Sequence, residues 1–364
     1  MKSLHLKKTI KSLFYSTLII SAIGLTSTVS AWERGKTKTF TLLPAGSAAA
    51  EGITKDADNN IYVSTLQLPP QPGNPPLPGQ VHKFNLAGQL LSTIDVTPSS
   101  GMLLDLDFHP NSGKLLILDM GTGQVLDVNP ITGDAVVFSQ LPDLTPNNPN
   151  AGPLPNVLTF DAVGNVYVSD SIQSTIWRIP PDGGTPEAWL SHDLLGTQSY
   201  PPFGANGLDF NKDFSILYVA NTGDDAIVEV PILADGTPGT PFVMAYSVDS
   251  PDGLIVDDDG TILIASFHGN HIMRVNTEGT AINVYSDFDG VDSNGVIKGV
   301  LTPSDIVTIN GNLYVPNLAL NITAFEQPEH VTSFYTGLVE RNSIAKIKPK
   351  KNAFRTHKKH HFAY

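Results

Sequence analysis

The chain has 364 residues, with 22 lysine or arginine and 35 aspartate or glutamate residues, and its formal net charge is −13. The absence of cysteine excludes disulfides, thiolate catalysis and thiolate metal sites. Four lysines lie in residues 1–31 and seven basic residues follow from 346, so the segment between them holds 11 basic and 35 acidic residues, a net charge of −24, which disfavours nucleic acid and favours cations.

The first element along the chain is a secretory signal peptide, expected over residues 1–31. Its start is basic, an apolar stretch runs from about residue 13 to 25, and Ala31 with its neighbours offers a cleavage site. A membrane anchor is the alternative, but the apolar stretch is short and contains serine and threonine. We therefore expect an exported protein, periplasmic or secreted, with no later transmembrane segment.

A phrase of similar pattern recurs six times in the rest of the chain. Each copy starts at one marked residue, which is polar in most copies and in several is followed by glycine. An apolar run, a polar turn and a second β-rich run follow. The copies begin between 46 and 53 residues apart, at Glu51, Leu104, Asn156, Asn206, Asp252 and Ser304. A regular period of this size is typical of propellers and solenoids.

The spacing of these runs predicts an all-β fold, a six-bladed β-propeller of four-stranded antiparallel blades over residues 32–348. Helical periodicity is absent outside the signal peptide. The last copy lacks a fourth strand, and residues 37–46 are expected to supply it, closing the ring and covering an open edge. Residues 349–364 are expected to be a flexible, solvated basic tail, with contact to an anionic surface as the alternative.

The first residue of each copy is a candidate site residue, because the innermost strand of a blade runs beside the central channel. Four of these six residues are strong oxygen donors, namely Glu51, Asn156, Asn206 and Asp252. Two carboxylates converging on one channel repel each other unless a cation lies between them. Carboxylate and amide oxygens suit one divalent ion, expected to be Ca²⁺, with Zn²⁺ or Mn²⁺ as alternatives. The simpler interpretation is that each polar residue only shapes a turn.

A second acidic motif, DDDG at residues 257–260, is similar to a calcium loop. The corresponding places in other copies read DADN, DAVG and NKDF, which have no common set of ligands. A hairpin turn between the first and second strands of the fifth blade is therefore the expected structure.

The motifs EG at Glu51, PN at Asn156, ANGLDF at Asn206 and SPDGLIVDDDG at Asp252 resemble the gluconolactonase, regucalcin and senescence-marker-protein family of six-bladed propellers. The resemblance implies that these four residues bind one divalent metal and that a lactone or similar ester is opened there. It further implies that Asp252 deprotonates the attacking water, and that Asn206 binds metal and helps to position the substrate.

The sequence also departs from the family pattern. Many members have an acid directly after the third-blade asparagine and an arginine two residues before it, whereas this chain has Val157 and Leu154. An apolar lactone or ester is therefore one expectation, with Phe203 and Phe267 either walling a pocket or packing in the core. The alternative function is a non-catalytic NHL-like propeller that binds a peptide, glycan or protein and carries a structural ion.

Two features near the expected metal face have alternative interpretations. His268 follows the second strand of the fifth blade, where it either assists proton transfer or is an exposed loop histidine. The proline-rich segment 66–80 is either a lid or a stiff surface loop.

Overall fold

The structure, a computed structural model, describes residues 36–68, 78–148, 151–285, 288–320 and 331–349. The expected signal peptide (1–31), all but the first residue of the expected tail (349–364) and most of the proline-rich segment (66–80) lie outside the described residues. Within the described part of the chain, no helix is long and apolar enough to cross a membrane.

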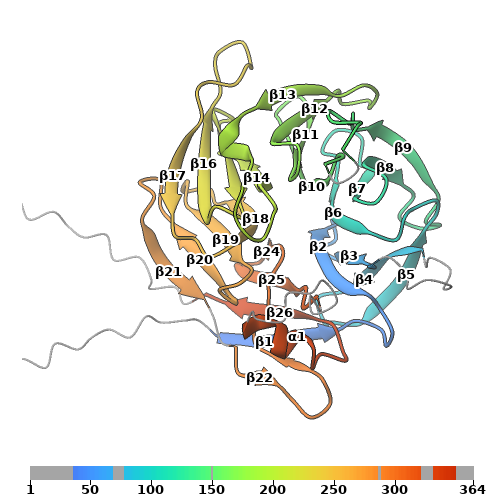
Figure 1. Cartoon of the computed structure of the whole chain (residues 1–364). Coiled ribbons are helices and arrows are strands. Elements are labelled where there is room, and N and C mark those ends of the chain that lie inside the picture. Colours follow the sequence, from blue (N-terminus) through green and yellow to red (C-terminus); the bar gives the residue numbers. More distant parts are fainter. Residues whose placement is uncertain (1–35, 69–77, 149–150, 286–287, 321–330, 350–364) are drawn as a thin grey trace, which may run out of the picture. The chain divides into compact units, whose positions relative to one another are not determined.

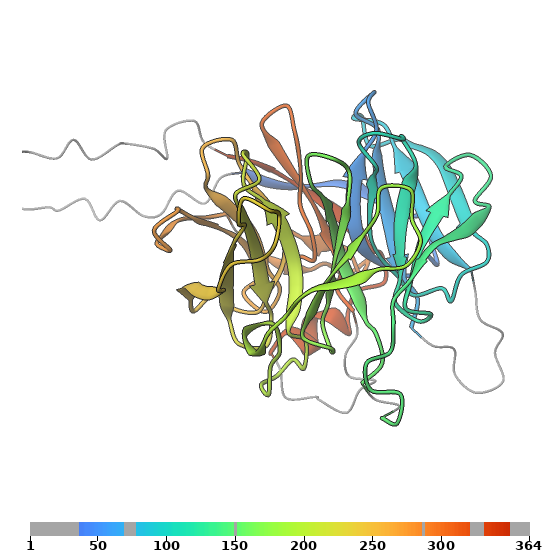
Figure 2. The ribbon, with the colours of Figure 1, turned by 90° about the horizontal axis from the view of Figure 1, so that it is seen from above.

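Six four-stranded antiparallel sheets surround a common channel, so the expectation of a six-bladed β-propeller is confirmed (Figure 1). The strands of the blades extend between two faces on which the loops gather (Figure 2). In the first five blades the strands follow chain order from the channel to the outside.

The first blade consists of β2 (Ala49–Lys55), β3 (Ile61–Leu66), β4 (Gly79–Phe84) and β5 (Leu90–Val96). The second consists of β6 (Leu103–Phe108), β7 (Leu115–Asp119), β8 (Gln124–Val128) and β9 (Ala135–Gln140). The third consists of β10 (Pro155–Phe160), β11 (Val166–Asp170), β12 (Thr175–Ile179) and β13 (Glu187–Ser191).

The fourth blade consists of β14 (Ala205–Phe210), β15 (Ile216–Asn221), β16 (Ala226–Pro231) and β17 (Phe242–Tyr246). The fifth consists of β18 (Pro251–Val256), β19 (Ile262–Ser266), β20 (His271–Val275) and β21 (Ala281–Tyr285). A small hairpin follows, formed by β22 (Gly290–Val291) and β23 (Ile297–Lys298).

The sixth blade combines both ends of the described chain. Its order from the channel outward is β24 (Val307–Ile309), β25 (Asn312–Asn317), β26 (Ser343–Lys348) and β1 (Lys36–Leu42). β1 pairs antiparallel with β26, and the Asn342 side chain donates to the Ser47 carbonyl over 3.0 Å. The strand that occupies the outer edge of this blade thus comes from the region expected to close the ring.

Burial explains why the pattern of apolar residues differs between the strands near the channel and those at the outside. The second strands β7, β11 and β19 are buried on both faces, and they read as nearly continuous apolar runs. The outer strands β5 and β13 mix exposed and buried positions. A strand covered on both faces by neighbouring blades needs apolar side chains at every position, whereas an outer strand needs them only on one face.

The main apolar clusters lie between adjacent blades rather than within single sheets. One cluster joins Tyr62 and Val81 of the first blade to Leu115 of the second, and another joins Tyr218 of the fourth to Ile264 of the fifth. Equivalent clusters occupy the remaining blade interfaces. This packing gives each blade two neighbours and holds the innermost strands around the channel.

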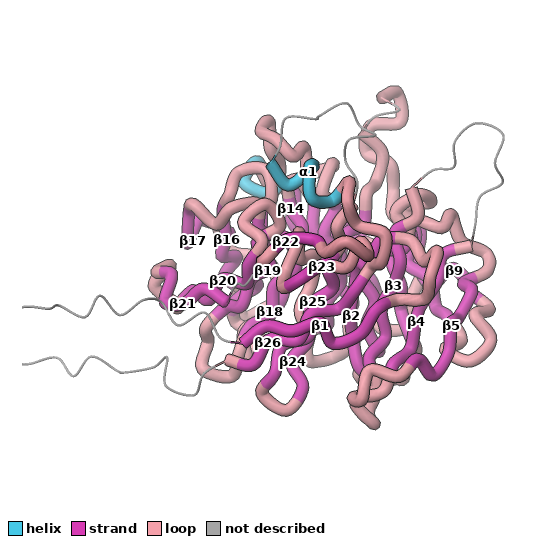
Figure 3. Tube along the Cα trace, turned by 90° about the horizontal axis from the view of Figure 1, so that it is seen from below, coloured by secondary structure: helices cyan, strands magenta, loops and turns pink. Residues whose placement is uncertain are grey.

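Three details differ from the sequence-based expectation. Among the described residues there are two short helices, η1 (Asp193–Leu195) and α1 (Val331–Thr336), both on one face (Figure 3). Neither is long enough to give a helical repeat in the sequence, which is why periodicity did not predict them. The innermost strand of the sixth blade begins at Val307 rather than at Ser304, whose hydroxyl instead donates to the Glu51 carbonyl over 2.6 Å.

The acidic motif at residues 257–260 forms the turn between β18 and β19. The amide of Asp257 donates to the Thr261 carbonyl over 2.8 Å, and the amide of Gly260 donates to the Asp257 carbonyl over 2.8 Å. Arg274 forms ion pairs with Asp257 and Asp259, at 3.4 and 2.8 Å. These carboxylates therefore have a structural role in the hairpin, as expected.

Candidate functional site

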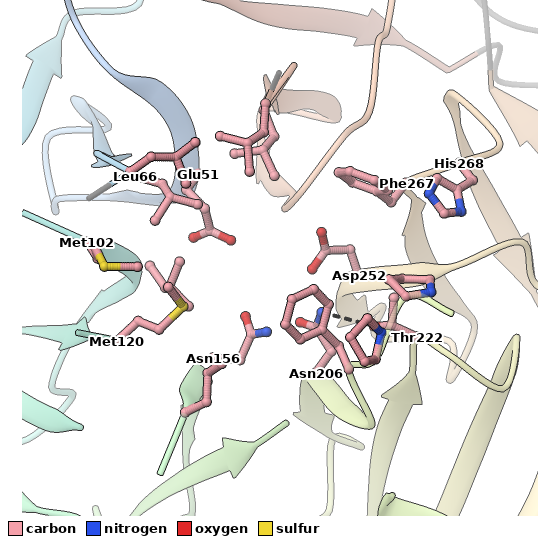
Figure 4. Close-up of a pocket in the computed structure, with 18 of the residues that line it drawn as sticks. Glu51, Leu66, Met102, Met120, Asn156, Asn206, Thr222, Asp252, Phe267 and His268 are labelled. Carbon is pink, nitrogen blue, oxygen red and sulfur yellow. Dashed lines mark hydrogen bonds between the residues drawn. The ribbon is translucent and has the colours of Figure 1, made fainter. Parts of the chain in front are cut away.

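The four expected oxygen donors line one cavity in the channel, near the starts of four different innermost strands. Glu51 lies in β2, Asn156 in β10, Asn206 in β14 and Asp252 in β18, and their side chains point toward a common centre (Figure 4). Each residue is at most 7% exposed. The cavity has a volume of about 580 Å³. The structure thus brings together residues that are up to about two hundred positions apart in the sequence.

A local irregularity turns these side chains toward the channel. In β10, β14 and β18 the register with the second strand shifts between the residue before the donor and the second residue after it. β2 has the same shift around Glu51. Such bulges re-aim a side chain and leave its residue out of the regular ladder, and they are common beside active sites.

The glycines that follow three of the donors have a separate cause. A Cβ added at Gly207 would lie 2.2 Å from the Asp252 carbonyl oxygen, and one at Gly253 would lie 2.6 Å from the Ser304 carbonyl oxygen. A Cβ at Gly52 would lie 2.7 Å from a Cα atom of the second blade. Close approach of neighbouring innermost strands therefore requires glycine, but it does not require the acidic or amide residue before it.

Two hydroxyl groups fix the orientation of the two asparagine side chains. Asn156 Nδ2 donates to Ser171 Oγ over 3.0 Å, and Ser171 Oγ donates to a backbone carbonyl over 2.7 Å. Asn206 Nδ2 donates to Thr222 Oγ1 over 3.0 Å, and Thr222 Oγ1 donates to the Pro251 carbonyl over 2.7 Å. Since each hydroxyl has one hydrogen and uses it on a carbonyl, it accepts from the amide NH₂. The amide oxygens are thereby left for the cavity.

Ser171 and Thr222 were not among the predicted site residues, although the sequence contains a signal for them. They directly follow the second strands of the third and fourth blades, which are the two blades with an asparagine donor. Met120, Phe267 and Leu318 hold the same position in blades two, five and six. A comparison of this position across the repeats would have paired each hydroxyl with its asparagine.

If the four donors bind calcium, as the sequence leads us to expect, Thr222→Val should lower calcium affinity by about 10- to 100-fold, as is usual when a partner that orients a metal ligand is lost. Valine keeps the shape but removes both hydrogen bonds of the hydroxyl, so the Asn206 amide is no longer fixed. Thr222→Ser, which keeps the hydroxyl, is the matched control. Calorimetric titration of metal-free protein with calcium measures both; equal affinities for the two variants would remove Thr222 as an orienting residue.

The electrostatics of the cavity favour a bound cation. Glu51 Oε2 and Asn206 Oδ1 are buried and have no hydrogen-bond partner in the protein. Burial, followed by the negative charge of Asp252, raises the pKa of Glu51 well above its usual range. Burial, followed by the charge of Asp305, also raises the pKa of Asp252, while a hydrogen bond from Asn206 acts in the opposite direction. A cation would satisfy both orphaned oxygens and offset the repulsion between carboxylates.

The donor set fits a hard divalent ion in chemical type. It provides two carboxylates and two amide oxygens, all from innermost strands, without histidine. Among the residues that the structure describes, no three acidic, histidine or cysteine side chains are grouped as metal ligands. This is consistent with a site in which amides supply half of the protein ligands, because calcium sites use neutral carbonyl oxygens as well as carboxylates.

Apart from the four donors, the cavity lining is mainly apolar. Phe203 and Phe267 line it, as does Leu154, which stands where the family pattern has arginine. Its other apolar lining residues are Leu66, Leu68, Met102, Leu104, Met120, Pro201, Pro202, Leu318 and Leu320. Neither lysine nor arginine occurs among the described lining residues. The arrangement combines a charged floor with a hydrocarbon wall.

His268 lines the same cavity and has defined neighbours. Its Nδ1 lies 2.7 Å from Ser250 Oγ, and its ring stacks on Tyr200 with an interplanar angle of 14° and a centroid separation of 6.4 Å. Ser250 has a positive φ of 44° and is held by Asp225, whose Oδ1 accepts from the Ser250 amide over 2.8 Å. The histidine is therefore a positioned part of the cavity wall.

A second group of carboxylates lies in or just before the innermost strands and was not predicted as a unit. Asp105, Asp107, Asp209 and Asp305 line a separate cavity of about 220 Å³. The Asp209 carboxylate accepts from the Val256 amide over 2.9 Å, and the Asp305 carboxylate accepts from the Ile53 amide over 3.0 Å. Each of these bonds joins two neighbouring blades. An acidic residue embedded in an apolar strand run, as in LDLDF, is the sequence signal for this role.

These interior carboxylates predict a pH-dependent stability. Burial is the largest cause that raises the pKa of Asp305 to about 7 and that of Asp209 to about 6. Between pH 4 and 7 the native protein then holds more protons than the unfolded chain, so the free energy of unfolding falls as the pH rises. One pKa unit corresponds to about 1.4 kcal/mol, and the expected decrease is therefore of the order of 2 kcal/mol or more.

Denaturant unfolding at pH 5 and pH 8, in the presence of chelator, measures this decrease. Asp305→Asn should reduce it, because one of the titrating groups is removed. The same slope in the variant and the original protein would show that Asp305 is ionised in both the native and the unfolded state.

The comparison with protein families supports the resemblance seen in the sequence. The family described as SMP-30/Gluconolactonase/LRE-like region matches residues 201–286, which include Asn206, Asp252 and His268. Glu51 and Asn156 lie outside the matched segment. No curated protein matches the chain in sequence.

Solved structures share the fold over most of the chain. A luciferin-regenerating enzyme has a TM-score of 0.61 and 14% identity, with 87% of this chain and 96% of that chain covered. The calcium-binding protein regucalcin from Agrobacterium tumefaciens has a TM-score of 0.56 and 17% identity, covering 85% and 96%. A gluconolactonase from Xanthomonas campestris has a TM-score of 0.55 and 15% identity, covering 87% and 90%. At these identities the likeness establishes the propeller fold, and the fold by itself does not determine the chemistry of the cavity.

Proposed function

We propose that this propeller, which resembles the SMP-30/gluconolactonase/LRE-like family, is a metal-dependent hydrolase that opens a lactone or similar ester in the channel. The observation that carries the proposal is the pair of buried, unpartnered oxygens, Glu51 Oε2 and Asn206 Oδ1, at the floor of an open cavity. A folded protein rarely leaves such atoms unsatisfied unless a ligand or ion completes them. The two oxygens lie beside a cavity with space for a small molecule, which favours a reaction site.

Glu51, Asn156, Asn206 and Asp252 would hold one divalent cation, for which calcium is our first choice. When bound, this ion supplies a Lewis acid that polarises the carbonyl group of the ester. Ser171 and Thr222 keep the two amide oxygens directed at the cavity. The carboxylates contribute charge, and the amides contribute oxygen donors that need no further counter-charge.

Asp252 is the proposed general base. Its carboxylate lines the cavity and is held by the Asn206 side chain, so it is placed to take a proton from a water molecule that attacks the carbonyl carbon. The bond between the carbonyl carbon and the ring oxygen then breaks, and the leaving alkoxide receives the proton that Asp252 took from water. The product is a hydroxy acid. Asn206, which touches Asp252 and faces the same space, positions the substrate.

The alternative is a non-catalytic propeller that binds a peptide, glycan or protein and carries a structural ion. Leu154 and Val157, in place of the arginine and acid of the family pattern, favour it, because they remove two polar groups from the third blade. A hydrolase and a binding propeller can share this fold. The distinction therefore rests on turnover.

A screen of lactones and carboxylic esters tests the proposal directly. The chain without residues 1–31, the expected signal peptide, is assayed with calcium, with zinc and with chelator. We expect hydrolysis that depends on added metal. A protein that binds calcium stoichiometrically yet hydrolyses none of these compounds would favour the binding function.

A further inference from the structure

We infer that the substrate is an uncharged lactone or ester with a hydrocarbon chain or aryl group, rather than a polyhydroxylated sugar lactone. The inference rests on the proposed hydrolase function and concerns the same cavity. It follows from what stands above the four oxygen donors, and it assigns that part of the cavity to the non-reacting part of the substrate.

The wall is built from residues that lie at or next to the ends of strands in several blades. Leu66, Met102 and Met120 lie on one side of the donors, and Phe267 lies on the opposite side (Figure 4). Met120 and Phe267 occupy the position at which the asparagine blades have a hydroxyl group. The repeat therefore uses this position for orienting a ligand in two blades and for apolar contact in others.

The polar groups of the lining are largely committed to other contacts. Thr222 Oγ1 donates to a backbone carbonyl and accepts from Asn206, and His268 Nδ1 contacts Ser250. The four donors face the proposed cation. A sugar lactone would place several hydroxyl groups against the apolar wall without partners, and each hydroxyl that loses its hydrogen bonds to water there weakens binding. A hydrocarbon chain has no hydrogen bonds to lose there, and its transfer from water to the apolar wall is favourable.

The size and flexibility of the wall point the same way. A volume of about 580 Å³ lies within the range of pockets that enclose drug-sized ligands, and it exceeds what the reacting ester group alone requires. Methionine side chains adapt to apolar ligands of different shapes, because they are unbranched and polarizable. Met102 and Met120 therefore favour a range of chain lengths over a single rigid substrate.

Binding of lactams tests the substrate class apart from catalysis. A lactam has the ring and carbonyl of a lactone but resists hydrolysis. We expect calorimetry with the calcium-loaded protein to show that affinity for γ-lactams with straight alkyl chains rises by up to about fourfold for each added methylene group. Lactams with hydroxylated chains of equal length should bind no better than the ring alone.

A matched pair of variants locates the binding of the chain. Met120→Gln keeps nearly the same side-chain length but makes the wall polar, and it should weaken binding of the longest lactam severalfold while leaving the shortest unaffected. Met273→Gln makes the same change at a partly buried methionine of the fourth-to-fifth blade interface, away from the cavity, and should change neither. Thermal melting of both variants checks that the fold is retained.

Hydrolysis of the corresponding lactones separates the two proposals. A rise in kcat/KM with chain length, parallel to lactam affinity, supports both. A chain-length dependence in lactam binding without any hydrolysis supports the apolar ligand class and overturns the hydrolase. Metal-dependent hydrolysis of a sugar lactone that exceeds that of every alkyl lactone overturns the apolar class and keeps the hydrolase. Failure of all the lactams to bind to calcium-loaded protein also overturns the apolar substrate class.

Discussion

Replacing Asp252 with asparagine is expected to lower kcat/KM by at least about a hundredfold, since a positioned general base contributes about 10²- to 10⁴-fold. Asparagine keeps an oxygen and the shape of the side chain but cannot take a proton from water. The variant should fold and bind calcium more weakly, so the assay is made at saturating metal, and bound metal is counted in each sample.

Leu104→Asn is the comparison for this experiment. It changes the residue at the equivalent place in the second blade, which lines the cavity but supplies neither charge nor a proposed ligand. It should keep more activity than Asp252→Asn. Full activity in metal-loaded Asp252→Asn would remove Asp252 as the base and make His268, the histidine of the cavity wall, the residue to test next.

Metal removal should lower stability. Replacement of Glu51 should then have opposite effects on stability with and without the metal. An ion that binds only the native state adds about 2.7 kcal/mol at a free concentration of 100 times Kd. For a domain of this size that is several degrees in Tm. Without the ion, the Glu51 carboxyl group is buried near Asp252, and its raised pKa means that its charged form is unfavourable there.

Glu51→Gln tests this role, because its effect on stability should reverse between chelator and saturating calcium. In chelator the variant should be more stable than the original protein, because a neutral amide replaces a group that is unfavourable when charged. In saturating calcium it should be less stable, because a charged ligand is lost. Glu278→Gln, an equivalent change at an exposed position, should alter neither value. Melting curves that are identical with and without metal, in a sample verified to be metal-free, would be incompatible with the proposed site.

The two asparagine donors show that position within the repeat carries more information than residue type alone. An isolated Asn-Gly pair is an ordinary turn signal. Here Gly207 is required by the approach of the next innermost strand, and the Asn206 amide is oriented by Thr222. The turn interpretation explains neither the hydroxyl nor the unpartnered oxygen of Asn206.

The amino-acid sequence by itself determined the repeat, the strand pattern, the six blades and the four donor positions. These are local properties, because alternation within a strand, a turn residue and the first residue of each copy can be read within one period of about fifty residues. Glu51 and Asp252 were recognised as partners only because a closed ring places the starts of all innermost strands at one channel. The order of these four residue types along the chain matches the ligand order that the resemblance to a known family implies.

The tertiary structure alone decided which side chains surround those donors. Leu66, Leu154, Phe203 and Leu318 come from four blades or loops, and no single stretch of sequence shows that they meet. The same holds for Asp305, which binds a backbone amide of the first blade at the opposite end of the chain. Contacts between distant segments depend on how the blades pack and on where each loop turns, which the periodicity of any one segment does not encode.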